Sequence, residues 1–266
     1  MKFLVQQQPA FVYTGGKTFD AAKPSVIFIH GAANDHSVWT FQSRYFAHHG
    51  FNVLALDLPG HGKSFGDAKT TIAQYADWVI NLCDNGAINT AAIVGHSMGS
   101  LIALDLAARY PMRISHLALL GCSAPMPVAD ALLDAAIHRP HEAFDMLNIW
   151  GHAPLVKWNK SAIPGTSLMM AYKCLLEKSR PGVLATDLTA CQTFAMNETE
   201  LKNIVAPTIV LSGTRDMMTP PKAAALVVKQ IAGAKFLSFE GVGHAMMQEA
   251  PGDVLDALKN FIQLKA

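Results

Sequence analysis

The amino-acid sequence predicts an α/β fold with a mostly parallel central sheet and flanking helices. Short, fully apolar runs of the kind that form strands buried on both faces recur along the chain. Helical stretches separate these runs, and strands that alternate with helices imply parallel pairing with right-handed crossovers. One long interval after the sixth expected strand lacks any strand-like run, which indicates a helical insertion.

The expected elements follow one another in a regular order. The chain opens with segments 3–8 and 11–19, which we expect to form an antiparallel hairpin with a turn over 14–17. The apolar runs expected to form the parallel strands are 26–29, 53–56, 91–94, 117–120, 208–211 and 235–239, the last with the partial alternation typical of an edge strand. The expected helices cover 37–48, 71–83, 97–109, 220–230 and 253–264.

The helical insertion divides the chain into two parts. We expect residues 1–122 and 201–266 to form the α/β core, and residues 123–200 to form a helical cap, or lid, over a substrate pocket. The insertion is punctuated by prolines and contains several methionines, a residue that adapts to irregular spaces. An ordinary helical subdomain, whose Met and Trp side chains fill its own core, remains the alternative.

Composition and charge narrow the classes of function. With 51% hydrophobic residues, 15% charged residues and a net charge of +1, the 266-residue chain has no electrostatic footprint for nucleic acid. We expect no membrane-spanning segment and no signal peptide, because the apolar runs are too short. The four cysteines, which lack C-x-x-C spacing, are Cys83, Cys122, Cys174 and Cys191. They predict reduced, mostly buried thiols and a cytoplasmic location, with a disulfide between residues 174 and 191 as the alternative.

The most informative motif is the sequence Gly95-His96-Ser97-Met98-Gly99. It lies between the apolar run 91–94 and the helix-like run 101–108, which is the strand–turn–helix context that gives G-x-S-x-G its meaning. A serine on such a turn adopts a strained backbone, and glycines on either side remove Cβ atoms that would crowd it. The motif therefore predicts a nucleophile, although a helix-capping serine in a tight turn remains the alternative.

A serine nucleophile needs a base and a third group that orients the base. Active sites in parallel α/β sheets form where loops leave the carboxyl ends of strands. The loop after 208–211 carries one carboxylate, Asp216, and the glycine-rich loop after 235–239 carries one histidine, His244. The resulting chain order is serine, acid, histidine.

In these motifs the chain closely resembles the α/β-hydrolase superfamily, in its serine-hydrolase branch with a helical cap. The resemblance runs from Pro24 to the end of the chain apart from the insertion, and includes His30-Gly31 and the segment 57–64. It implies that Ser97 is the nucleophile, His244 the general base and acid, and Asp216 the residue that fixes the histidine tautomer. It further implies an oxyanion hole formed by the backbone N–H groups of Ala32 and Met98.

Other candidates for these roles fit less well. His30 and His61 adjoin glycines in turns and are expected to order loops, and the side chain of His96 is expected to point away from the serine. Asp57 is the second candidate for the acid, but its Pro-Gly-His-Gly context is typical of a turn-stabilising aspartate. The segment 60–64 is no phosphate-binding loop, since the P-loop spacing requires glycine where Asp57 stands.

We therefore expect a serine esterase that uses no cofactor or metal and acts on a small-molecule substrate through an acyl-serine intermediate. The expected pocket favours small to medium, largely apolar groups and is bordered by Met146, Trp150, Met217, Met218 and Met246. The alternatives are a carbon–carbon bond hydrolase, a lactonase, and a cofactor-free haloperoxidase or perhydrolase. Ala245 disfavours the first, because many such enzymes have an aromatic residue after the catalytic histidine. A non-catalytic receptor or scaffold is disfavoured by the complete triad.

Overall fold

The fold is that of a computed structural model, which describes residues 2–157 and 165–263. Within these residues one sheet of eight strands has the order β1-β2-β4-β3-β5-β6-β7-β8. Strands β3 to β8 pair in parallel, while β1 and β2 are antiparallel, which confirms the mostly parallel sheet. The strands are β1 Lys2–Val5, β2 Gln8–Tyr13, β3 Ser25–Ile29, β4 Asn52–Leu56, β5 Ala91–His96, β6 Ile114–Leu120, β7 Thr208–Gly213 and β8 Lys235–Phe239.

The opening hairpin forms, but with a different turn from the expected one. Gln6 and Gln7 join β1 to β2 with φ values of 51° and 64°, so both central residues occupy the left-handed region that a two-residue hairpin turn of this type requires. The expected turn at 14–17 closes with a hydrogen bond from the Lys17 N–H to the Thr14 carbonyl, but it follows β2 instead of joining the hairpin strands. Glutamine carries no sequence signal for positive φ, so the site of the turn was not predictable.

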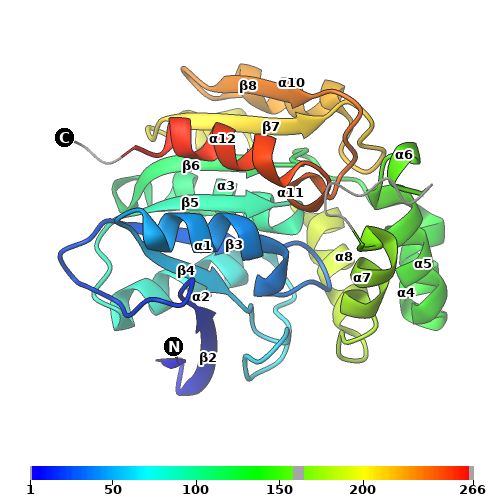
Figure 1. Cartoon of the computed structure of the whole chain (residues 1–266), viewed down its shortest axis with the longest axis horizontal. Coiled ribbons are helices and arrows are strands. Elements are labelled where there is room, and N and C mark those ends of the chain that lie inside the picture. The colour runs from blue at the N-terminus through cyan, green and yellow to red at the C-terminus, as the bar shows by residue number, and fades with distance from the viewer. Residues whose placement is uncertain (1, 158–164, 264–266) are drawn as a thin grey trace.

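Helices cover both faces of the sheet (Figure 1). Helices α2 and α3 lie on one face, and α1 and α12 lie on the other. The segment expected as one helix over 37–48 divides into the 3-10 helix η1 and α1. The helices of the core are η1 His36–Trp39, α1 Thr40–His48, α2 Ile72–Asn85, α3 Met98–Arg109, η2 Pro111–Arg113, α9 Glu198–Lys202, α10 Pro221–Gln230, α11 Met246–Glu249 and α12 Pro251–Phe261.

Burial on both faces explains why the sequences of the central strands are continuous apolar runs. Every residue of β3, β4, β5 and β7 is buried, because helices pack on both faces of the sheet there. In contrast, four of the five residues of β8 at the sheet edge are exposed. Two apolar clusters form the core, one between the sheet and α2–α3 and one between the sheet and α1–α12. This packing fixes the carboxyl ends of the strands, from which the functional loops emerge.

The described part of 123–200 is helical, and none of its described residues is in a strand. These helices gather at the end of the sheet where the parallel strands terminate (Figure 1). They share an apolar cluster of their own, which includes Leu132, Phe144 and Leu184. Residues 158–164 of this segment lie outside the described residues. The helices are α4 Asp130–His138, α5 Pro140–Gly151, α6 Pro154–Lys157, α7 Leu168–Leu176 and α8 Val183–Thr193.

Two remaining features bear on the sequence expectations. All four cysteines are free; Cys174 is exposed and the other three are buried. Burial raises the pKa of the Cys122 thiol to about 11, so this thiol stays protonated at neutral pH. Among the described residues no helix is both long and apolar enough to cross a membrane.

Candidate active site

Ser97 occupies a sharp turn between β5 and α3. Its backbone is strained, with φ 54° and ψ −121°. A Cβ on Gly95 would collide with the backbone carbonyl of Gly99, and a Cβ on Gly99 would collide with the carbonyl of Ile29. Glycine is therefore required on both sides, because the strand and helix approach each other too closely for any side chain. The packing holds the strained serine at the end of β5.

Asp216 and His244 come from the loops after β7 and β8 and meet directly. The Nδ1 atom of His244 lies 2.8 Å from Oδ2 of Asp216, and both side chains are buried. The carboxylate also accepts hydrogen bonds from the backbone N–H groups of Met218 and Thr219 and from the Thr219 hydroxyl, at 2.9, 2.8 and 2.7 Å. These contacts fix the orientation of the carboxylate toward the imidazole.

The same contacts set the charge of Asp216. Burial alone would raise the pKa of this carboxyl group, but the charge and hydrogen bond of His244 lower it, and the two donors of Thr219 act in the same direction. The net result is a pKa below the usual value of 3.8. Asp216 is therefore a carboxylate at neutral pH and accepts a hydrogen bond from the Nδ1–H group of His244, which leaves Nε2 as the free acceptor of the ring.

Ser97 and His244 line one cavity of about 160 Å³. The Nε2 atom of His244 is buried and has no hydrogen-bond partner among the described residues. It is the ring atom that can exchange a proton with a hydroxyl group in this cavity. The structure thus brings Ser97 to the same cavity as His244, whose ring is held by Asp216.

The cavity wall differs in part from the expected one. Trp150, Met217 and Met218 line it, but Met146 and Met246 do not. Met246 is fully buried in the core cluster on the α1–α12 face, and Met146 packs at the edge of the insertion's own cluster. Their order along the chain could not show on which side of a helix each side chain lies. The other lining residues are Ala32, Asn34, His96, Met126, Pro127, Val128, Ala129, Leu132, Leu147, Tyr172, Leu188, Cys191 and Thr219.

A second hollow, of about 570 Å³, is larger but lies at the amino-terminal ends of the strands. It is lined by Ser25, Thr90 and Ser115 among others and contains none of the elbow, acid or histidine residues. Active sites of parallel sheets form at the opposite ends of the strands. The smaller cavity is therefore the candidate site.

His96 holds the backbone of His244 in place. Its Nε2 atom donates a 2.9 Å hydrogen bond to the backbone carbonyl of His244, and the two rings lie 4.6 Å apart. Burial lowers the pKa of His96 to about 3, so the ring is neutral. Although His96 also lines the cavity, its hydrogen bond is to a backbone carbonyl, in keeping with the structural role expected for it.

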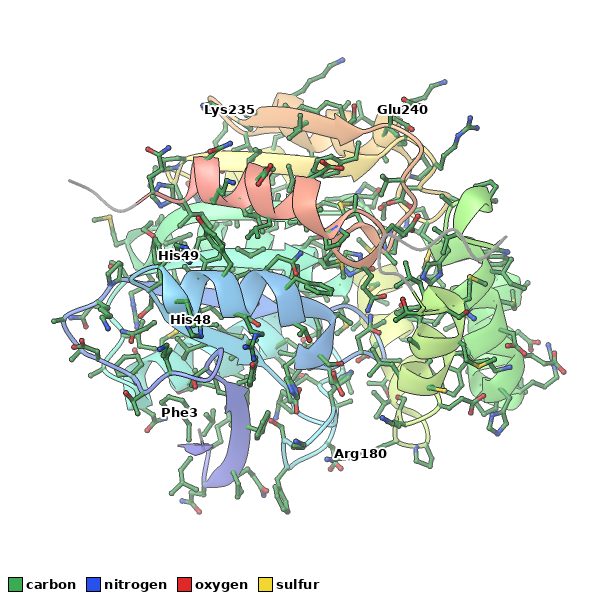
Figure 2. The ribbon with its side chains drawn as sticks, viewed as in Figure 1. Phe3, His48, His49, Arg180, Lys235 and Glu240 are labelled. Atoms are coloured by element: carbon green, nitrogen blue, oxygen red, sulfur yellow. The ribbon has the colours of Figure 1, made fainter. Side chains whose placement is uncertain are left out.

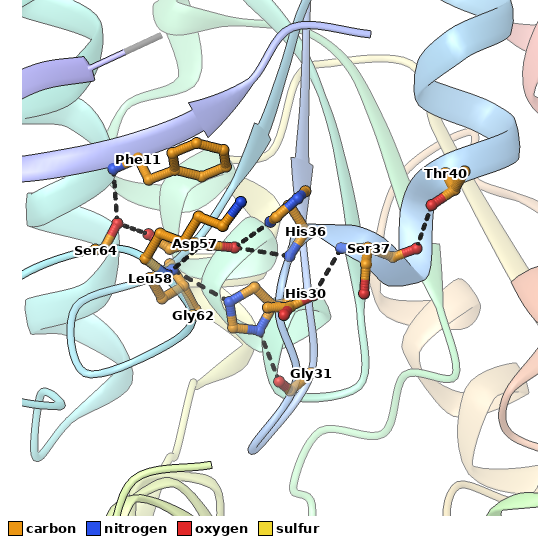
Figure 3. A network of polar contacts seen from close by, with 12 residues as sticks. Phe11, His30, Gly31, His36, Ser37, Thr40, Asp57, Leu58, Gly62 and Ser64 are labelled. Carbon is orange, nitrogen blue, oxygen red and sulfur yellow. Dashed lines mark hydrogen bonds and ion pairs between the residues drawn. The ribbon is translucent and has the colours of Figure 1, made fainter. Parts of the chain in front are cut away.

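The loop that carries Ala32 is ordered by His30 and Asp57 (Figure 3). His30 donates from Nδ1 to the Gly31 carbonyl at 2.8 Å and accepts at Nε2 from the Leu58 N–H at 3.1 Å. Asp57 accepts from the N–H and the Nδ1 of His36, at 2.8 and 2.6 Å. Both residues thus hold loops together, as their glycine-rich contexts indicated.

Folding also gathers the ligand atoms of Asp35, His36 and Asp57 within 4.8 Å of one another. The sequence spacing did not show this cluster, because Asp57 follows a different strand. Its polar atoms have protein partners: Asp35 accepts from the Ser37 N–H, and Asp57 pairs with His36. These contacts show that the cluster stabilises the two loops, and we assign no ligand to it.

Gly121, at the end of β6, is a part of the site that the sequence did not indicate. Its φ is 56°, and a Cβ there would lie 2.8 Å from Cε1 and 2.9 Å from Nδ1 of His244. The close approach of this glycine leaves room for the imidazole in its observed position. A side chain at this residue would displace the ring from Asp216 and Ser97.

We expect Gly121→Ala to lower kcat about 100-fold, since a displacement of about 1 Å in a catalytic group has effects of that order. The matched control is Gly233→Ala, which places alanine at a φ of 70° with no atom within 4 Å of its Cβ. Both variants carry the cost of positive φ, but only the first contacts His244. Hydrolysis rates for each folded protein would check this, and equal losses in the two variants would contradict it.

Comparison with known proteins identifies relatives of the chain. The chain is 25% identical over 261 residues to the pimeloyl-[acyl-carrier protein] methyl ester esterase of Aromatoleum aromaticum, covering 91% of this chain and 99% of that protein. A more local match, 41% identical over 109 residues, spans only 28% of the dihydrolipoyllysine-residue acetyltransferase component of the acetoin cleaving system of Cupriavidus necator.

The fold matches that of the enol-lactonase from Burkholderia xenovorans with a TM-score of 0.87 and 22% identity, covering 98% of this chain and 99% of that one. At this identity the likeness concerns the fold alone. A family model described as the alpha/beta hydrolase family matches residues 26–257. Because that match spans most of the sequence, the chain belongs to the alpha/beta hydrolase family.

Proposed function

We propose that the protein is a serine esterase that hydrolyses small, uncharged, largely apolar esters. The observation that carries this proposal is that Ser97, on its strained turn, lines the same cavity as His244, which is hydrogen-bonded to the buried Asp216. A binding protein has no need for a buried carboxylate–histidine pair beside such a serine. The methyl ester esterase of Aromatoleum aromaticum, which is similar over nearly its whole length, supports the same class of reaction.

In the proposed reaction His244 Nε2 takes the proton of Ser97 while Oγ attacks the ester carbonyl carbon. The negative charge that develops on the carbonyl oxygen is stabilised by the backbone N–H groups of Ala32 and Met98. The latter lies at the first turn of α3, where N–H groups lack helical partners. The imidazolium then protonates the leaving alcohol. A water molecule activated by the same ring attacks the acyl-serine and releases the carboxylic acid.

Residues 123–200 act in this proposal as a cap that shapes the substrate cavity. Helices α4, α5, α7 and α8 each supply lining side chains: Leu132, Leu147, Trp150, Tyr172 and Leu188. The volume of about 160 Å³ resembles the engineered cavities of about 150 Å³ that take up benzene. Among the described lining residues none is Lys, Arg, Asp or Glu. The cavity thus favours a short, uncharged acyl group, since a charged one would lose its hydration without gaining a partner.

p-Nitrophenyl esters of graded acyl length test this function. We expect kcat/KM to be highest for acyl chains of about two to six carbons, a range chosen to fit the cavity, and to fall for longer chains and for a hemisuccinate ester. A fluorophosphonate should label the protein once, at Ser97. Labelling without turnover of any ester would contradict the esterase proposal, and the absence of labelling would support a binding role instead.

The same chemistry would open a lactone, because Ser97 attacks a cyclic ester in the same way. The fold shared with an enol-lactonase makes lactones the second class to include in the screen. A lactone that is turned over faster than every linear ester would reassign the substrate.

The free and mostly buried thiols fit a reducing compartment, and we propose a cytoplasmic location on that ground.

A further inference from the structure

Asp187 in α8 is a fully buried carboxylate that belongs to the insertion but binds the core. Its Oδ2 accepts a 2.9 Å hydrogen bond from the Ala33 N–H and lies 2.8 Å from Nε2 of His61. Its Oδ1 accepts a 2.8 Å hydrogen bond from the Tyr75 hydroxyl. One side chain of the insertion therefore contacts three separate parts of the core: the loop after β3, the loop after β4, and α2.

Asp187 and His61 form a buried hydrogen-bonded pair. The Nδ1 atom of His61 lies 2.9 Å from the Pro59 carbonyl, which can only accept, while Nε2 faces the carboxylate. Both ring nitrogens thus face acceptors, an arrangement that suits a protonated, positively charged ring. Burial opposes this charge, but Asp187 raises the pKa of His61 above its usual value. Because a buried charge without a partner is costly, the carboxylate strongly favours the arrangement in which all three donors reach it.

The bond to Ala33 places this network next to the proposed oxyanion hole. Ala33 has a φ of 56°, a strained conformation for alanine that its surroundings must maintain. Its N–H group belongs to the peptide that joins it to Ala32. The hydrogen bond that this N–H group donates to Asp187 thus fixes the plane of the peptide directly after Ala32, the residue whose own N–H is proposed to bind the oxyanion.

We propose that Asp187 is a positioning residue for the oxyanion hole, which is fully formed only when the insertion is docked on the core. This inference rests on the proposed serine esterase function. The insertion then contributes to the rate of the chemical step, as well as to the shape of the cavity.

A second tie holds the insertion to the same side of the core. Arg180, just before α8, donates from its guanidinium to the carbonyls of Gly62, Ser64 and Gly66, at 3.3, 2.5 and 3.4 Å. Figure 2 shows Arg180 beside this loop after β4. Because His61 lies in the same loop, this loop is bound at two places, by Arg180 and by Asp187. The insertion thus contacts both the loop after β4 and the loop that carries Ala32 and Ala33.

The test compares Asp187→Asn with Asp105→Asn. Asp105 is also a buried carboxylate, but it pairs with Arg109 within α3 and contacts neither loop. We expect Asp187→Asn to lower kcat and the rate of fluorophosphonate labelling about tenfold to 100-fold, with KM changed less than about threefold, since the loss of an oxyanion donor acts on the transition state. Hydrogen–deuterium exchange of residues 30–34 should accelerate in the same variant. Asp105→Asn should leave all four readouts unchanged.

Several outcomes would overturn the inference. These are an unchanged kcat in Asp187→Asn, a rise in KM alone, a loss of kcat without faster loop exchange, or the same losses in Asp105→Asn. If Asp187→Asn does not fold, the wild-type protein provides the test: its Ala33 amide should exchange as slowly as strand amides, and rapid exchange would contradict the contact. Labelling and exchange need no known substrate, so these results are distinct from wild-type ester turnover, which decides the proposed function.

Discussion

Ser97→Ala is expected to remove nearly all hydrolytic activity, with a fall in kcat of about 10⁵-fold or more, because the acyl-enzyme can no longer form. Alanine tolerates the φ of 54° about as well as serine does, so the elbow between β5 and α3 should keep its shape. The variant should therefore unfold at a temperature close to that of the wild-type protein. Steady-state kinetics with the best ester and fluorophosphonate labelling measure the effect.

Ser212→Ala is the matched control. Ser212 is a buried serine in β7 whose hydroxyl has no hydrogen-bond partner among the described residues, and it is not part of the cavity wall. Its replacement should leave kcat and labelling unchanged. Residual activity of Ser97→Ala above about 1% of wild type would exclude Ser97 as the nucleophile.

The sequence was sufficient to predict the features that depend on local pattern. The strands β3 and β5 are buried on both faces, as their continuous apolar runs predicted. The location of Ser97, Asp216 and His244 at one edge of the sheet was also predictable, although the three lie far apart along the chain. Parallel strands bring their carboxyl ends to one edge of the sheet, so the strand pattern alone assigned these loops to one region.

The features that escaped prediction depend on packing between distant segments. Nothing near Asp187 indicates that its carboxylate meets the loops after β3 and β4, because that contact arises only when α8 docks. The position of Met246 escaped for a related reason: the glycine-rich loop before it turns α11 toward the core. The steric role of Gly121 likewise requires the position of the His244 ring. Each of these depends on three-dimensional contacts that a linear pattern does not specify.

Asp216→Asn is expected to lower kcat about 10⁴-fold while leaving the fold intact, an effect of the size seen when a triad histidine is held in the wrong tautomer. The reason lies in the donors around the side chain. Two backbone N–H groups, of Met218 and Thr219, point at Oδ1, so an asparagine must place its carbonyl oxygen there. Its NH₂ group then faces Nδ1 of His244, where the carboxylate oxygen stood.

An NH₂ group in that position donates to Nδ1 and forces the imidazole proton onto Nε2. The ring can then no longer accept the proton of Ser97, and both kcat and the labelling rate should fall together. Asp57→Asn provides the comparison, because Asp57 was the second candidate for the acid but binds His36 and Lys63 instead of the catalytic ring. It should weaken the loop after β4 and reduce stability, with kcat lowered by less than about tenfold. Only at residue 216 do the neighbouring N–H groups force the NH₂ group of the new asparagine to point at the imidazole. Equal losses of kcat in the two variants would therefore contradict the assignment of Asp216 as the acid of the triad.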